Sequence, residues 1–189
     1  MERMIYLLPI GDIDRSILLR LKKRLKIALE GYNINAGIYP EDIQLDNLDY
    51  NVEREQYHAT RILKKLSKVF REKHFYRILG VMDRDIYTKN YNFIFGIANP
   101  ISRIALISIR RLREKFYKES GLIHRTAKSK IKFEIRVYKE SIHELGHTFG
   151  LKHCFNSCVM NFSNSLADTD NKPEEFCLSC LSKLNLDED

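Results

Sequence analysis

Two histidines and a glutamate lie within five residues of one another, in the run HELGHTFGLKH. His143 and His147 are four residues apart, so on a helix both imidazoles project from one face and can bind one ion. Glu144 lies between them and can reach a water molecule on that ion without binding the ion. Gly150 can adopt the left-handed conformation that ends a helix, which brings His153 back as a third ligand. Three protein ligands with an open fourth position are typical of a catalytic zinc, whereas a structural zinc has four.

This arrangement predicts hydrolysis by a zinc-activated water. Neutral imidazoles leave the zinc a strong Lewis acid, which lowers the pKa of its water toward about 7. Glu144 would accept the proton of that water as general base and pass it to the leaving amine. Two alternatives stay open: an ordinary amphipathic helix, and a zinc site that has lost activity. The extension to Gly150 and His153 argues against the first, and the intact Glu144 argues against the second.

Four cysteines follow this run, and the chain has no others: Cys154, Cys158, Cys177 and Cys180. Their C-x3-C and C-x-x-C spacings favour a closed four-thiolate zinc site. Disulfides, reduced thiols or a redox pair are the alternatives, although no thioredoxin-like context surrounds the C-x-x-C pair. Cys154 directly follows His153, and Cys158 precedes Met160 by two residues. We therefore expect that loss of Cys177 or Cys180 weakens zinc binding at the histidines.

The elements that must position these residues alternate between strand and helix. Apolar runs with strand or helix spacing, separated by Gly, Pro and Asp signals, predict an α/β sandwich. The predicted strands are Met4–Ile10, Ile34–Tyr39, Tyr76–Met82, Tyr91–Ala98 and Ile101–Ile109. The predicted helices are Ile17–Leu29 with Asp14 as cap, Val52–Phe70 and Lys128–Phe149, the last preceded by a polar loop at Ser120–Lys130. The first three strands should be parallel. Regular structure should end at Gly150.

Charge and composition restrict the function further. The formal net charge of +7 would suit an acidic partner, but the basic residues are mixed with acids and apolar positions, as on solvated helix faces. Nucleic acid is therefore not the expected partner. No apolar run approaches the roughly 18 residues of a membrane span. Met4–Ile10 is too short for a signal peptide, so we expect a cytoplasmic protein and, without any sign of an oligomer, a monomer.

The motifs HELGHTFGLKHC, CVM and CLSC, all within residues 142–180, resemble those of the archaemetzincins, a metzincin family of zinc metallopeptidases. The runs GVMDRDIY, FIFGIA and RIALISIRRL are similar to the family's strands. The resemblance implies a three-layer sandwich with a five-stranded mixed sheet, a long catalytic helix and a small zinc-stapled C-terminal lobe. It also implies a catalytic zinc on His143, His147 and His153, Glu144 as general base, and a structural zinc on Cys154, Cys158, Cys177 and Cys180.

The resemblance further implies that Met160 forms a hydrophobic floor beneath the zinc, as the methionine of a Met-turn. Some metzincins have a tyrosine two residues after this methionine, but here the position is Phe162, so that position supplies no phenol. An extended substrate would pair with an edge strand above the catalytic helix, for which Asn92–Ala98 is the candidate.

The leading hypothesis is a two-zinc metallopeptidase that acts on peptides or selected proteins. Residues 1–150 would form the α/β part that ends with the active-site helix, and residues 151–189 a loop-rich part with the Met-turn and the cysteine site. The alternatives are a catalytically silent zinc scaffold and a zinc-stabilised nucleic-acid-binding module. The acidic end Leu186–Asp189 and the lack of a known recognition motif argue against the second alternative.

Overall fold

The computed structural model describes residues 3–117 and 127–184. Its helices and strands are β1 (Arg3–Ile10), α1 (Arg15–Leu29), a 3-10 turn (Glu30–Tyr32), β2 (Ile34–Ile38), a 3-10 turn (Asn47–Asp49), β3 (Tyr50–Asn51), β4 (Gln56–His58), α2 (Ala59–Val69), β5 (Arg77–Met82), β6 (Ile86–Tyr87), β7 (Gly96–Asn99), β8 (Ile104–Ser108), a 3-10 turn (Glu114–Tyr117), α3 (Ala127–Thr148), α4 (Leu166–Asn171) and α5 (Leu178–Leu181). The predicted loop Ser120–Lys130 lies mostly outside the described residues.

Five strands form the central sheet in the order β2-β1-β5-β8-β7. The first four are mutually parallel, and β7 runs antiparallel to β8. The sheet is therefore mixed, and β7 lies at one edge, which confirms the predicted fold class. The two final strands are shorter than expected, because residues 91–95 precede the ladder and residues 100–103 form the turn between the strands.

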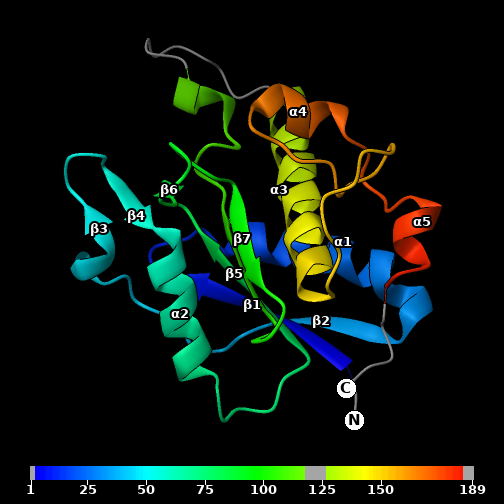
Figure 1. Cartoon of the computed structure of the whole chain (residues 1–189), viewed down its shortest axis with the longest axis horizontal. Helices are drawn as coiled ribbons and strands as arrows, with labels where there is room; N and C mark the ends of the chain where they lie inside the picture. The colour runs from blue at the N-terminus through cyan, green and yellow to red at the C-terminus, as the bar shows by residue number, and fades with distance from the viewer. Residues whose placement is uncertain (1–2, 118–126, 185–189) are drawn as a thin grey trace.

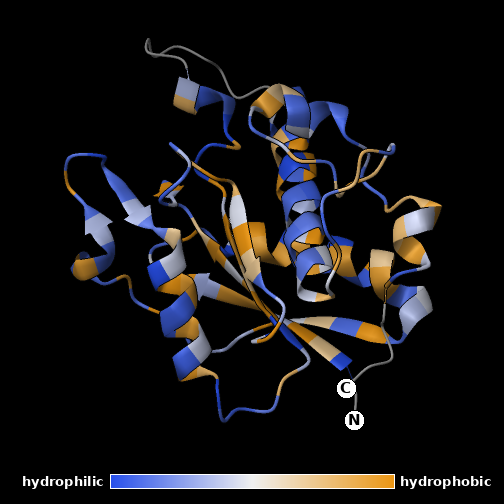
Figure 2. Ribbon diagram, in the orientation of Figure 1, coloured by the Kyte–Doolittle hydropathy of each residue, from blue (hydrophilic) through white to orange (hydrophobic). Residues whose placement is uncertain are grey.

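Helices cover both faces of this sheet (Figure 1). Helices α1 and α3 pack on one face, where the larger apolar cluster includes Leu18, Leu25 and Val137. Helix α2 packs on the other face through Ile62 and Leu66, which join a second cluster with Ile78 and Leu106. Helices α2 and α3 carry both hydrophobic and hydrophilic residues along their length (Figure 2), as expected for helices with one buried side. The result is three layers with α3 directly on the sheet.

Two predictions about local structure were wrong. Helix α2 begins at Ala59 rather than Val52, because Gln56–His58 forms a strand that pairs with β3 and β6. The Gln56 amide donates to Asp85 Oδ2 and to the Asn92 carbonyl, each at 2.9 Å, which fixes this segment by tertiary contacts. Regular structure also continues after Gly150, in the short helices α4 and α5.

The part of the chain after α3 packs against α3. Its buried residues Cys158, Val159 and Met160 belong to the same apolar cluster as α1 and α3. The division into residues 1–150 and 151–189 stays a prediction. Among the described helices, none is both long and apolar enough to cross a membrane.

Candidate metal centres and active site

The last turn of α3 and the loop after it bring three histidines together. His143 and His147 lie on one face of α3, and the chain reverses at Gly150, whose φ is +86°. The Leu151 amide donates to the Gly146 carbonyl at 3.1 Å, which closes the helix end and directs the following residues back. His153 thereby meets the other two, with one ring nitrogen of each histidine within 4.8 Å of the others. We call these three residues the histidine cluster.

Backbone carbonyls set the tautomers of two of these rings. His143 Nδ1 lies 2.9 Å from the Val159 oxygen, and His147 Nδ1 lies 2.7 Å from the Leu151 oxygen. Because a carbonyl only accepts, each Nδ1 carries the proton, and the Nε2 of each neutral ring presents a lone pair. The two Nε2 atoms face each other at 3.1 Å. Two lone pairs at this distance repel unless a cation lies beside them, and tetrahedral zinc would hold such nitrogens about 3.4 Å apart.

Burial, which is only partial for His153, lowers the pKa values of all three imidazoles. It lowers the pKa of His143 well below its usual range, and the Lys172 ammonium lowers it further. Burial is also the main cause of the lowered pKa values of His147 and His153. Since zinc binds only the neutral ring, the donor set fits a zinc ion without a protonation penalty near neutral pH.

Glu144 is buried beside the histidine cluster and is held by the edge strand. A Cβ atom on Gly96 of β7 would lie 2.5 Å from Glu144 Cγ and 2.6 Å from Oε1, so glycine is required for the carboxylate to occupy this place. Within the described residues, Oε2 of Glu144 has no hydrogen-bond partner. Burial raises the pKa of Glu144 well above its usual range, the neighbouring Glu140 raises it further, and Lys172 opposes both. A buried carboxylate of this kind is a candidate proton acceptor.

Met160 lies directly under the helix that carries the histidines. It is fully buried, and its sulfur would lie 2.5 Å from a Cβ atom on Gly146. The Met160 carbonyl also accepts from the Cys154 amide at 3.0 Å, which ties the floor to the residue after His153. The role of Met160 as a floor beneath a zinc ion stays a prediction.

The four cysteines form a second group, which we call the cysteine cluster. Their sulfurs lie within 4.8 Å of one another, and none forms a disulfide. The sulfurs of Cys154 and Cys177 are 3.8 Å apart, far beyond the roughly 2.05 Å of a disulfide. Four thiolates at the usual Zn–S distance of about 2.3 Å lie about 3.8 Å apart at tetrahedral angles, so the spacing fits zinc.

Hydrogen bonds stabilise negative charge on these sulfurs. The amides of Cys177 and Met160 donate to Cys158 Sγ, at 3.3 and 3.5 Å. The Asn156 amide donates to Cys177 Sγ and is the main cause that lowers the pKa of Cys177 to about 6. Burial instead raises the pKa values of Cys158 and Cys180. A bound cation would compensate for that burial.

A cleft of about 490 Å³ opens beside the histidine cluster. One wall is β7 and the segment before it, and the opposite wall is the loop after Met160. Its aromatic lining includes Tyr91 and Phe162, whose ring centroids are 6.1 Å apart. Glu140 and Glu144 line the side formed by α3. The cleft is therefore bordered by an edge strand, the histidine cluster and a candidate proton acceptor.

Sequence reasoning missed several residues of this site. Glu140 lies one helical turn before Glu144, so helix periodicity alone places it on the same face. Gly96, Tyr91 and Lys172 have no such local signal, since each reaches the site from another element. Position 162, where some metzincins have a tyrosine, is a phenylalanine here. The Tyr91 side chain brings a phenol to the cleft beside Phe162 instead.

Comparisons with known proteins give the family. The sequence profile described as peptidase family M54 matches residues 20–186. The archaemetzincin of Pyrococcus furiosus is 38% identical over 97% of this chain and 93% of its own length. That of Methanocaldococcus jannaschii is 42% identical over 93% and 89%. The crystal structure of archaemetzincin from Archaeoglobus fulgidus complexed with malonate is 36% identical, with a TM-score of 0.76 over 95% of this chain and 99% of that chain. The chain therefore belongs to peptidase family M54, the archaemetzincins, a family of zinc metallopeptidases.

Proposed function

We propose that this protein hydrolyses peptide bonds with a zinc ion held by His143, His147 and His153 and with Glu144 as general base. The observation that carries the proposal is the close approach of two ring nitrogens in the cleft. The Nε2 atoms of His143 and His147, each with a lone pair, lie 3.1 Å apart beside a buried carboxylate. A zinc ion on these nitrogens lowers the pKa of a bound water toward about 7 and polarises the peptide carbonyl.

The protein side chains supply the proton transfers and the alignment. Glu144 accepts a proton from the attacking water and delivers it to the leaving amine, and its Oε2 is free for this exchange within the described part of the chain. Contact with Gly96 keeps the carboxylate from moving toward β7. The backbone carbonyls at Val159 and Leu151 hold two ligand rings in the required tautomer.

Strand β7 is the proposed binding edge for an extended peptide. It is the last strand of the sheet, and all four of its residues are half-buried. Residues 95–98 line the same cleft as His143 and Glu144. A peptide paired with the outer edge of β7 would therefore pass in front of the ligand histidines. This edge is shorter than the predicted segment Asn92–Ala98.

We further propose a second zinc on Cys154, Cys158, Cys177 and Cys180. Its support is the sulfur spacing of 3.8 Å, together with backbone amides aimed at Cys158. This zinc is structural, because four thiolates leave no open position. It fixes the loop that carries His153 and Met160, since Cys154 follows the first and Cys158 precedes the second.

Metal content and peptide cleavage test the proposal together. The wild-type protein should contain two zinc ions per chain and His147→Ala only one. A peptide library should be cleaved by the wild type, and both a chelator and Glu144→Gln should abolish cleavage. The Glu144→Gln protein should still contain two zinc ions, because the glutamate is not a ligand. Loss of zinc in Glu144→Gln, or equal cleavage by the variant, would contradict the assigned roles.

A further inference from the structure

A buried ion pair lies behind the histidine cluster. Lys172 Nζ is 2.8 Å from Glu140 Oε1, and the two side chains are only 2% and 3% exposed. The Thr169 hydroxyl donates to the same Glu140 oxygen at 3.2 Å. Lys172 is the first residue after α4, whereas Glu140 lies on α3 and lines the cleft. A buried charge is expensive, and loss of one partner leaves the other uncompensated.

Charge balance gives this pair a role in the site. Glu140 and Glu144 are two buried carboxylates one helical turn apart on the same helix, and two like charges in a desolvated site repel each other. The Lys172 ammonium is the counter-charge in contact with Glu140.

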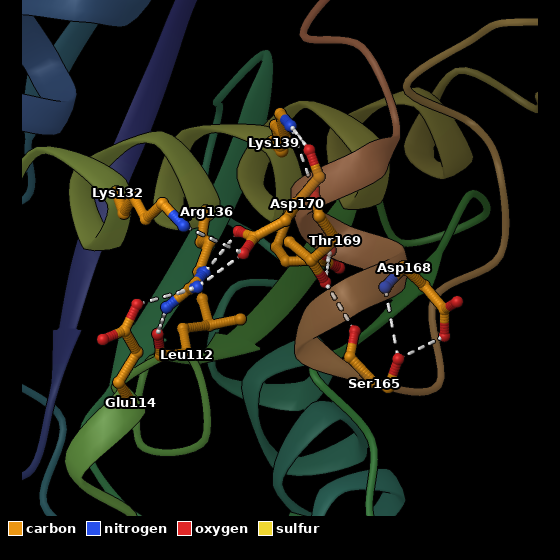
Figure 3. A network of polar contacts seen from close by, with 10 residues as sticks. Leu112, Glu114, Lys132, Arg136, Lys139, Ser165, Asp168, Thr169 and Asp170 are labelled. Carbon is orange, nitrogen blue, oxygen red and sulfur yellow. Dashed lines mark hydrogen bonds and ion pairs between the residues drawn. The ribbon is translucent and has the colours of Figure 1, made fainter. Parts of the chain in front are cut away.

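The attachment of α4 to α3 does not depend on Lys172. Lys139 Nζ donates to the carbonyls of Thr169 and Asp170, at 3.0 and 2.8 Å. Arg136 makes a two-pronged contact with the Asp170 carboxylate, at 2.6 and 2.7 Å (Figure 3). These contacts hold α4 in place on the side away from the cleft. A structural anchor is therefore already present, and the charge of Lys172 has a separate effect.

We propose that Lys172 is a positioning residue that acts through Glu140: it neutralises that carboxylate, so that Glu144 is the one uncompensated carboxylate beside the metal. The inference rests on the proposed function, in which Glu144 acts next to a zinc ion. Without Lys172, the uncompensated negative charge of Glu140 would add to that of Glu144 beside the zinc site.

Four proteins separate charge balance from packing. The Glu140–Lys172 pair contributes no net charge in the wild type, −1 in Lys172→Met, +1 in Glu140→Gln, and none in the double variant. The zinc affinity of the histidine cluster should rise as the net charge of the pair becomes more negative. Lys172→Met should bind zinc about tenfold more tightly than wild type and Glu140→Gln about tenfold more weakly, with the double variant within about threefold of wild type.

Competition with a chromophoric chelator measures this affinity. The zinc at the histidine cluster is identified as the one that the His147→Ala protein lacks. Thermal unfolding is the second readout. Lys172→Met should unfold on the order of 10 °C below wild type, and adding Glu140→Gln should recover most of that loss. Turnover of a cleaved library peptide should follow the same pattern, with kcat lowered at least tenfold in Lys172→Met and restored in the double variant. Asp170→Asn is the control, because it weakens the anchor of α4 and leaves the charge pair intact.

The zinc affinities decide the inference without a measurement of peptide turnover. Weaker zinc binding in both single variants, or no recovery in the double variant, assigns Lys172 to packing alone and overturns the proposal. The ordered affinities support it. If the four proteins show the predicted order of zinc affinities but the wild type cleaves no peptide, the proposed function fails and the proposal for Lys172 stands.

Discussion

The histidine cluster and the cysteine cluster meet at the loop that carries His153 and Cys154, but they differ in how their side-chain atoms are held. Backbone carbonyls accept from His143 and His147, which leaves one lone pair of each ring facing a cleft. Backbone amides donate to Cys158 instead, and two of the four cysteines are buried. Acceptors at Nδ1 leave Nε2 of each neutral imidazole to face the cleft, and donors around sulfurs favour thiolates. The first arrangement suits an open reactive site and the second a closed structural site.

The two clusters are also unequal in their supports. His143 and His147 are fixed by a helix, whereas the His153 ring is exposed and packs against Phe162, with no carbonyl partner in the described part of the chain. The next residue, Cys154, belongs to the cysteine cluster, and its amide donates to Met160. We therefore predict that the third histidine depends on the cysteine cluster for its position. This dependence runs in one direction, which mutations can test.

The largest effect is expected from Cys177→Ser. Removal of one thiolate should release the structural zinc, which costs on the order of 5 kcal/mol or more of folding free energy, because binding of such a zinc is coupled to folding. His153 then loses its support, so zinc at the histidines should be weakened as well, although Cys177 is not one of its ligands. Metal content per chain and thermal unfolding measure both effects.

A matched control lies on the same loop. Phe155 follows Cys154 but is 99% exposed, so Phe155→Ser should leave both zinc ions and the unfolding temperature unchanged. If Cys177→Ser keeps full zinc affinity at the histidines and the fold, the two clusters are independent, and the one-way dependence is wrong.

A smaller effect is expected from Gly96→Ala, which displaces Glu144 beside the histidine cluster and leaves the cysteine cluster intact. The added Cβ would lie 2.5 Å from Glu144 Cγ, so the carboxylate must shift. A displacement of about 1 Å in a catalytic group lowers kcat by roughly 10²-fold. Steady-state kinetics should show this loss with both zinc ions retained. Gly31→Ala is the control, since no atom lies within 4 Å of its added Cβ. Equal kcat values in the two variants would show that β7 does not position Glu144.

The contact between Gly96 and Glu144 also marks the limit of sequence reasoning. The grouping of the three histidines and of the four cysteines was predictable, because helix geometry and short spacings bring them together by local rules. The β–α alternation likewise predicted an α/β sandwich with five strands, and the family resemblance implied that their sheet is mixed. Gly96 and Lys172 were not predictable, since each reaches Glu144 or Glu140 through tertiary packing across many residues. The wrong start of α2 has the same origin, because the contacts of Gln56 with Asp85 and Asn92 override local helix preference.

The smallest effect is expected in Glu144→Gln without zinc at the histidines, and it depends on pH. Burial raises the folded-state pKa of Glu144 above its usual value of 4.5. The folded protein then binds the proton more tightly than the unfolded chain, so this contribution to stability is present below about pH 4.5 and is lost as the pH rises toward the folded pKa. Glutamine has no proton to lose. The variant should therefore gain stability relative to wild type as the pH rises, by about 1–3 kcal/mol at pH 8 and by less at pH 5.5.

Denaturant unfolding with zinc retained only at the cysteine cluster measures this difference, with the exposed Glu53→Gln as control. Zinc at the histidines should reverse the sign, because a dication favours the carboxylate over the amide. A gain in stability of Glu144→Gln at pH 8 that disappears on zinc addition would show that the Glu144 carboxylate destabilises the fold until a cation binds at the histidine cluster. A gain that zinc leaves unchanged would place Glu144 too far from the metal to act on its water.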